Sequence, residues 1–174
     1  MNKESKVVTY EEVEQRLKNV PFEKLTAEDV FDRYIGYGDS EELQDIKVQK
    51  LLLKHNFTEY LINSVETIIT DKTVIEGIAT SNLLEDSKYS FIKGKVESVE
   101  ITEDEELPKG FVWLFVNLVD ESKEECKLKY MYYPQKQESY KNQIEQSIGR
   151  DVSAIVERLE NKKDLRLCCL LQEK

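Results

Sequence analysis

The chain is poor in the residues on which catalytic and metal sites most often depend. Its 174 residues include one histidine, three cysteines and three prolines. The single histidine, His55, excludes within one chain both a histidine-rich metal site and a conventional histidine-dependent triad. A pattern of Asp120 with Glu125-Cys126-Lys127 is only faintly similar to that of metal-dependent nucleases, and its spacing across a turn is too short. We therefore expect no enzymatic activity.

Long apolar runs are also missing. The longest fall far short of the roughly 20 residues that a membrane span needs, and the first residues lack the apolar core of a signal peptide. The adjacent pair Cys168 and Cys169 does not have the spacing of a zinc site, and with Cys126 it predicts reduced, partly buried thiols. We therefore expect a cytoplasmic protein without a metal, a cofactor or membrane contact.

Negative charge dominates the composition. The chain has 35 acidic and 25 basic residues, a net charge of −10. Residues 1–86 carry a net −8 and residues 87–174 a net −2, and four of the acidic residues of the second half stand together at 103–106. A strongly negative chain repels nucleic acid and is steered toward positive protein surfaces.

The first half predicts short helices. Three pairs have the spacing of helix N-terminal capping boxes before apolar stripes: Thr9 with Glu12, Thr26 with Asp29, and Asp39 with Glu42. The third helix would bury a stripe of Leu43, Ile46, Lys50 and Leu53. A fourth helix begins near Thr58, whereas Val74–Ala79 is too short and too β-branched to assign. We expect an acidic helical subdomain over residues 1–86, ending in a linker at about 80–86.

The second half alternates with the period of strands. Residues 91–101, 111–119 and 126–133 predict three strands, and a change of phase near Glu97 and Ser98 predicts a bulge in the first. Residues 135–148 then change to a helical period, with Tyr140, Ile144 and Ile148 on one stripe and Gly149 as the helix end. Two more strands follow at 152–159 and 165–172. On the last, Leu165, Leu167, Cys169 and Leu171 would share a face.

The order of three strands, one helix and two strands resembles the oligonucleotide/oligosaccharide-binding (OB) superfamily in element order and length. The resemblance implies a five-stranded Greek-key β-barrel (β-β-β-α-β-β) over residues 87–174. With the helical subdomain before it, we expect an α+β chain. It also implies a binding face on the second and third strands.

If the aliphatic side of residues 112–118 faces the core, the opposite side of the strand carries candidate binding residues. Trp113, Phe115, Lys127, Lys129 and Tyr133 then point outward together, helped by Lys162, Lys163 and Arg166. Unpaired bases stacked on such rings would each contribute ~1–3 kcal/mol. In the alternative interpretation, the N-terminal helices cover Trp113 and Phe115, because a strand that is apolar on both faces is typical of a sheet covered on both sides.

Two functions remain. The favoured one is a protein-interaction subunit or inhibitor that acts through the acidic helical region and the barrel. Such a subunit could belong to a nucleic-acid-processing complex. The alternative is a module that binds single-stranded DNA or RNA through the aromatic and lysine face. A homodimer through a strand edge over residues 152–171 also stays open.

Overall fold

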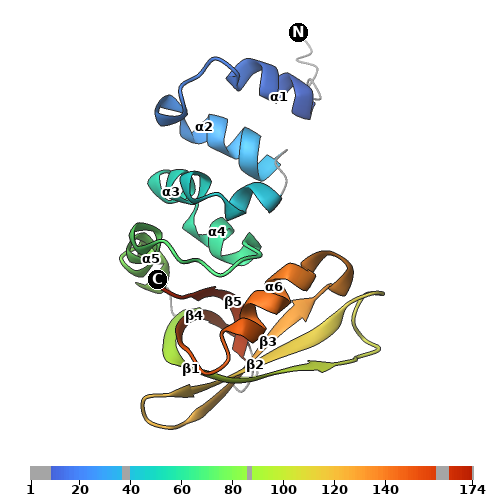
Figure 1. Cartoon of the computed structure of the whole chain (residues 1–174). Helices are drawn as coiled ribbons and strands as arrows, with labels where there is room; N and C mark the ends of the chain where they lie inside the picture. The colour runs from blue at the N-terminus through green and yellow to red at the C-terminus, as the bar shows by residue number, and fades with distance from the viewer. Residues whose placement is uncertain (1–8, 37–39, 86–87, 160–164, 174) are drawn as a thin grey trace.

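A computed structural model describes residues 9–36, 40–85, 88–159 and 165–173, and within them the fold is α+β. Helices of the N-terminal half are stacked on a five-stranded sheet (Figure 1). The helical elements are α1 (Tyr10–Leu17), η1 (Phe22–Lys24), α2 (Ala27–Val30), η2 (Phe31–Gly36), η3 (Ser40–Gln44), α3 (Ile46–Lys54), α4 (Thr58–Ser64), α5 (Lys72–Ala79), η4 (Asn82–Glu85) and α6 (Pro134–Gln146). The strands are β1 (Tyr89–Thr102), β2 (Val112–Asp120), β3 (Glu125–Tyr132), β4 (Asp151–Arg158) and β5 (Leu165–Leu171).

The first two predicted helix starts are confirmed. The Thr9 hydroxyl accepts a hydrogen bond from the backbone N–H of Glu12 at 3.2 Å. Thr26 and Asp29 form both bonds of a capping box, each side chain accepting from the other residue's N–H. These bonds satisfy backbone donors that have no partner within the helix.

The third helix begins later than predicted. Asp39 lies outside the described residues, and the carboxylate of Asp45 caps α3 by accepting from the N–H of Lys47 at 2.8 Å. The predicted stripe is wrong, because Ile46 and Lys50 are exposed. Contacts of α3 with η3, α4 and α5 instead bury the arc that contains Val48, Gln49, Leu51 and Leu52.

The segment left unassigned is a helix. Asp71 caps α5 by accepting from the N–H of Val74 at 3.0 Å, and Val74 and Ile78 are fully buried. Its β-branched residues have modest helix propensity, so packing against α3 decides its structure.

The five strands pair in the order β1-β2-β3-β5-β4, and pairing of β1 with β4 closes the sheet into a ring. All pairs are antiparallel except β3 with β5, which meet in parallel at Leu128↔Leu165 and Lys129↔Arg166. The predicted order of strands and helix is confirmed. Strand β4 lies between β1 and β5 and offers no free edge for a second chain, whereas β5 pairs with β3 only at Leu165 and Arg166. The homodimer stays a prediction.

Strand β1 closes the ring because it changes partner along its length. It pairs with β4 over Tyr89–Lys95 and with β2 from Gly94 onward. The predicted bulge is confirmed by a register shift between Val96 and Ser98. A Cβ atom added to Gly94 would lie 2.7 Å from the carbonyl oxygen of Val119, so this close approach of backbones requires glycine.

Helix α6 closes one end of the ring. Tyr140 and Ile144 are buried in the core inside the sheet, as predicted. Ile148, the third residue of the predicted stripe, is 45% exposed because the helix ends at Gln146. Gly149 has a φ of 85°, and its N–H donates to the carbonyl of Val96 at 2.7 Å.

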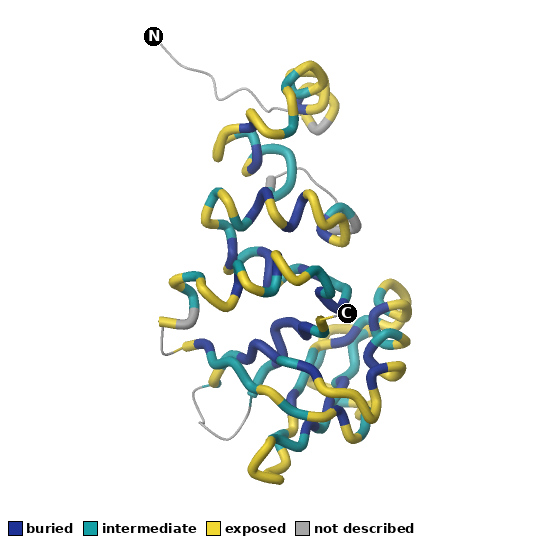
Figure 2. The backbone as a smooth tube through the Cα atoms, turned by 60° about the vertical axis from the view of Figure 1, so that its left-hand side comes forward, coloured by how far each residue is buried: buried dark blue, intermediate teal, exposed yellow. Residues whose placement is uncertain are grey.

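A second core joins the helices to the sheet. Leu61, Ile62 and Ile78 pack in one cluster with Ile155 and Leu171, and this junction is dark in Figure 2. Backbone bonds also cross it: the N–H of Ile69 donates to Leu170 at 3.0 Å, and the N–H of Gln172 donates to Ile69 at 2.9 Å. The boundary at residue 86 stays a prediction.

The prediction that Leu165, Leu167, Cys169 and Leu171 share one face of the last strand is wrong. The pairing of β4 with β5 shifts between Ile155↔Cys169 and Val156↔Leu167, so Cys168 is an extra residue. Leu167 therefore faces the core inside the ring, whereas Cys169 and Leu171 face the helices. A bulge changes the phase of every residue after it.

The approach of β1 to β2 gives a first prediction. Gly94→Ala should lower the free energy of unfolding by about 1–3 kcal/mol, because the new methyl group meets a backbone carbonyl that cannot move alone. Urea unfolding measures this. Gly77→Ala is the matched control: its Cβ would meet only the terminal methyl of Leu53, at 2.9 Å, and alanine favours the helix. Equal losses in both variants would contradict the assigned role of Gly94.

Candidate binding face on strands β1 to β3

The outer face of β1, β2 and β3 consists of three cross-strand rows. The pairing aligns Thr102 with Trp113 and Met131, Glu100 with Phe115 and Lys129, and Ser98 with Asn117 and Lys127. On the opposite face of β2, Leu114, Val116 and Leu118 are fully buried. The predicted inward and outward phases of β2 are therefore confirmed.

Lysine side chains cover the two rings of this face. The Lys127 Nζ lies 4.5 Å from the ring centroid of Phe115, and the Lys129 Nζ lies 4.8 Å from that of Trp113. Both rings are half-buried, and neither belongs to the core that the helices share with the sheet. The helices pack on β1, β4 and β5 instead, so the alternative in which they bury Trp113 and Phe115 is wrong.

Carboxylates lie beside the same lysines and rings. The Lys127 Nζ is 3.7 Å from Glu100 Oε2. The Trp113 indole N–H donates to Asp104 Oδ2 at 3.0 Å, and the backbone N–H of Glu106 donates to Asp104 Oδ1 at 2.9 Å. These two bonds, with the nearby charge of Lys129, hold the pKa of Asp104 below its usual value. The face is thus of mixed charge, not uniformly positive.

Tyr133 extends the aromatic surface past the end of β3. Its ring centroid lies 4.8 Å from that of Phe111, and its hydroxyl donates to Gln135 Oε1 at 2.9 Å. Gly110 has a φ of 91°, and a Cβ there would lie 2.7 Å from the Tyr133 ring, so glycine is needed on both counts. Phe111, Trp113 and Tyr133 therefore stand near the same end of the face.

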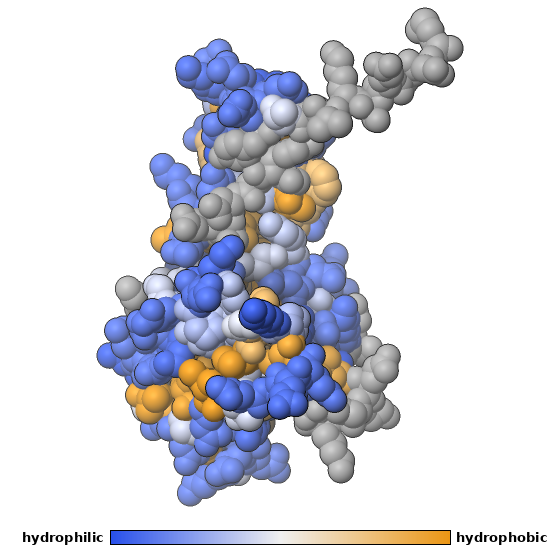
Figure 3. Space-filling model, turned by 90° about the vertical axis from the view of Figure 1, so that its right-hand side faces the viewer, coloured by the Kyte–Doolittle hydropathy of each residue, from blue (hydrophilic) through white to orange (hydrophobic). Residues whose placement is uncertain are grey.

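Figure 3 shows the side of the molecule that carries the loop between β1 and β2. Apolar side chains gather there in a band across the half of the molecule that contains the sheet, between hydrophilic surfaces. Met131, in the row of Thr102 and Trp113, is 43% exposed, whereas Ile101, which is 47% exposed, pairs with Leu114 and lies on the opposite face of β1. Exposed apolar surface with a polar rim is typical of interaction sites.

Among the remaining candidate residues, Arg166 pairs with Lys129 and so continues a row of this face onto β5, where Glu157 offsets its charge. Lys162 and Lys163 lie outside the described residues. Arg166 Nη2 donates to Asn63 Oδ1 at 2.6 Å and to Glu157 Oε2 at 3.2 Å, so its guanidinium joins α4 to β4. The bond from Arg166 holds the pKa of Glu157 below its usual value.

Sequence reasoning missed Asp104 and Glu100 as members of the site. Asp104 is one of four acidic residues at 103–106, and Glu100 is one polar position of a predicted strand, so neither stands out in the sequence. Only the return of β2 brings Asp104 to the indole of Trp113 and places Glu100 opposite Phe115. No local pattern could have identified them.

The described residues contain no group of three or more His, Cys, Asp or Glu side chains arranged to hold a metal ion. Asp120, from the faint nuclease pattern, accepts from the N–H of Glu124 and closes the β2–β3 turn, where Lys123 has a φ of 63°. Cys168 and Cys169 are buried, and burial raises the pKa of the Cys168 thiol to about 11. Neither arrangement suggests a reactive group.

No protein-family model matches the chain, and none of the curated proteins matches its sequence. None of the helices in the described ranges has the length and apolar character to cross a membrane. Conclusions about function therefore rest on the geometry of the chain itself.

The bond between Trp113 and Asp104 gives a second prediction. Because folding lowers the pKa of Asp104, the bond should be complete above the usual aspartate pKa of about 3.9 and should break as pH falls through the lower folded value. Trp113 is the only tryptophan, so its emission reports this step directly.

The measurement is an acid titration of Trp113 emission, with far-ultraviolet circular dichroism at each pH to separate the local step from unfolding. Asp104→Asn keeps an acceptor but cannot titrate, so its emission should stay constant while the fold persists. An unchanged transition in this variant would assign the signal to another group.

Proposed function

We propose that this chain is a non-enzymatic binding protein, a protein-interaction subunit or inhibitor, and that it docks a protein partner on the outer face of β1, β2 and β3. The observation that carries the proposal is the composition of that face. Half-buried aromatic rings stand beside lysines whose charge is offset by Glu100 and Asp104.

We also propose that the C-terminal half is a Greek-key barrel of the OB type. Support comes from the strand order β1-β2-β3-β5-β4, from the parallel meeting of β3 with β5, and from the position of α6 between β3 and β4. Barrels of this type use the face of their second and third strands for ligands.

Mixed charge favours a protein over a nucleic acid as the ligand. Phosphate binding gains free energy when an excess of lysine and arginine releases counterions, and this face has no such excess among its described residues. Aromatic residues and methionine are enriched in protein interfaces and supply most of their hot spots.

The third prediction tests this face with two double variants. Tagged full-length chain should recover one dominant protein partner from cells that contain it. Trp113→Ala with Phe115→Ala should weaken the purified complex by about 30-fold, because central aromatic anchors contribute ~2 kcal/mol or more. Isothermal titration calorimetry measures the change.

The matched control truncates two exposed apolar residues of the helical half. Phe31→Ala with Ile46→Ala removes side chains that are 50% and 42% exposed on η2 and α3 of the helical half, and should leave the affinity unchanged. If the control weakens binding as much as the face variant does, the partner docks elsewhere.

The fourth prediction concerns nucleic acid. A labelled single-stranded oligonucleotide should not bind the chain even at low salt, where electrostatic attraction is strongest. Fluorescence anisotropy measures this. Binding that weakens as salt rises, and that Lys127→Glu with Lys129→Glu abolishes, would replace the protein-docking proposal with the single-strand-binding alternative.

A further inference from the structure

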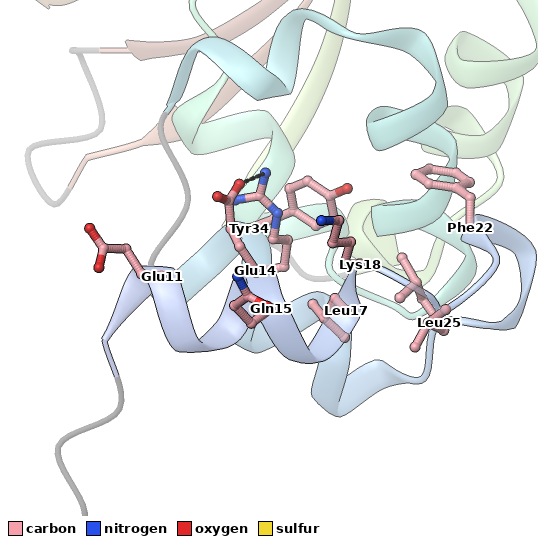
Figure 4. Close-up of a pocket in the computed structure, with 10 residues that line it drawn as sticks. Glu11, Glu14, Gln15, Leu17, Lys18, Phe22, Leu25 and Tyr34 are labelled. Carbon is pink, nitrogen blue, oxygen red and sulfur yellow. Dashed lines mark ion pairs between the residues drawn. The ribbon is translucent and has the colours of Figure 1, made fainter.

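The helical half contains an open groove of about 640 Å³ between α1 and the segment that runs from η1 to η2 (Figure 4). Polar side chains of α1 and the turn after it, Glu11, Glu14, Gln15 and Lys18, form one wall. Apolar and aromatic side chains form the rest: Leu17, Val20, Phe22, Leu25 and Tyr34.

Helix α1 leaves part of its apolar stripe uncovered. Val13 on α1 is fully buried, whereas Leu17 at the end of α1 and Val20 in the turn after it are half-buried. Among the described elements, α1 packs chiefly on η2. An eight-residue helix depends on tertiary packing for its stability, so further contacts along this stripe would stabilise it.

Two basic residues line the groove, Lys18 and Arg33, and the charge of Arg33 is already neutralised. Arg33 Nη2 lies 3.1 Å from Glu14 Oε1, drawn as a dashed line in Figure 4, and 2.9 Å from Glu42 Oε1. Glu11 is exposed on the same wall as Glu14. Residues 9–36 and 40–85 contain fifteen acidic and eight basic residues, so the groove lies in a negative field.

We propose that this groove binds an amphipathic helix of a protein partner. Apolar residues of that helix, spaced i, i+3 and i+4, pack on Leu17, Phe22 and Leu25, and its lysine or arginine residues face Glu11. Charge complementarity selects a basic helix over an acidic one. This surface lies in the other half of the chain from the sheet face, so each site can be tested, and can fail, separately.

The fifth prediction uses a model helix as the probe. A labelled peptide of about 14 residues, roughly four turns, carries leucine at the i, i+3 and i+4 positions and lysine elsewhere. Anisotropy with the full chain at low salt should show saturable binding. A peptide of the same composition with leucine and lysine alternating, which cannot form an apolar helical stripe, should bind about tenfold more weakly.

Two charge variants of α1 and its C-terminal turn locate the site. Glu11→Lys with Gln15→Lys places new positive charge on the groove wall and should weaken binding of the amphipathic peptide by about fivefold. Glu12→Lys with Asn19→Lys changes the net charge equally in the same segment, but neither residue lines the groove, so binding should change less than twofold. The apolar contact is tested by Phe22→Ala, which should also weaken binding.

Three outcomes would overturn the proposal. These are no saturable binding of the amphipathic peptide, equal binding of the alternating peptide, and equal weakening by the two double variants, which would mean attraction by net charge alone. Circular dichroism and thermal unfolding of each variant confirm that the helical half stays folded. Trp113→Ala with Phe115→Ala should leave peptide binding intact, so failure of the sheet-face proposal does not affect this test.

Discussion

The contact between the backbones of β1 and β2 at Gly94 is the constraint on which the sheet depends. One strand can bond first to β4 and then to β2 only if it bends sharply, and a side chain at the bend would meet the carbonyl of Val119. The bulge after Val96 completes the turn. Ring closure then fixes which residues of β2 face inward, and therefore the composition of the outer face.

The outer face keeps polar groups close to apolar ones without burying an unpaired charge. Lysines extend along the rings of Phe115 and Trp113 and keep their ammonium groups near carboxylates. Asp104 orients the indole from the loop between β1 and β2. A partner that docks here can displace lysine side chains sideways, because they are long and flexible, and reach rings that are otherwise shielded from water.

Features of the fold that depend on residues close in sequence could be predicted from the sequence. Alternation gave the two faces of β2, the phase change at Glu97 gave the bulge, and threonine caps gave the starts of α1 and α2. The predictions were wrong where contacts with segments distant in sequence determine the structure. The phase change at Cys168 depends on the register with β4, the buried arc of α3 depends on α4 and α5, and the role of Arg166 depends on Asn63. None of these partners is adjacent in sequence.

The backbone bonds of Ile69 with Leu170 and Gln172 have a consequence for synthesis. Translation delivers the helical segments first, yet their shared core includes Ile155, Cys169 and Leu171, which leave the ribosome much later. During that interval the nascent helices expose apolar surface that chaperones recognise. Packing of the N-terminal helices should therefore be completed only once β5 has been made and can supply Cys169 and Leu171.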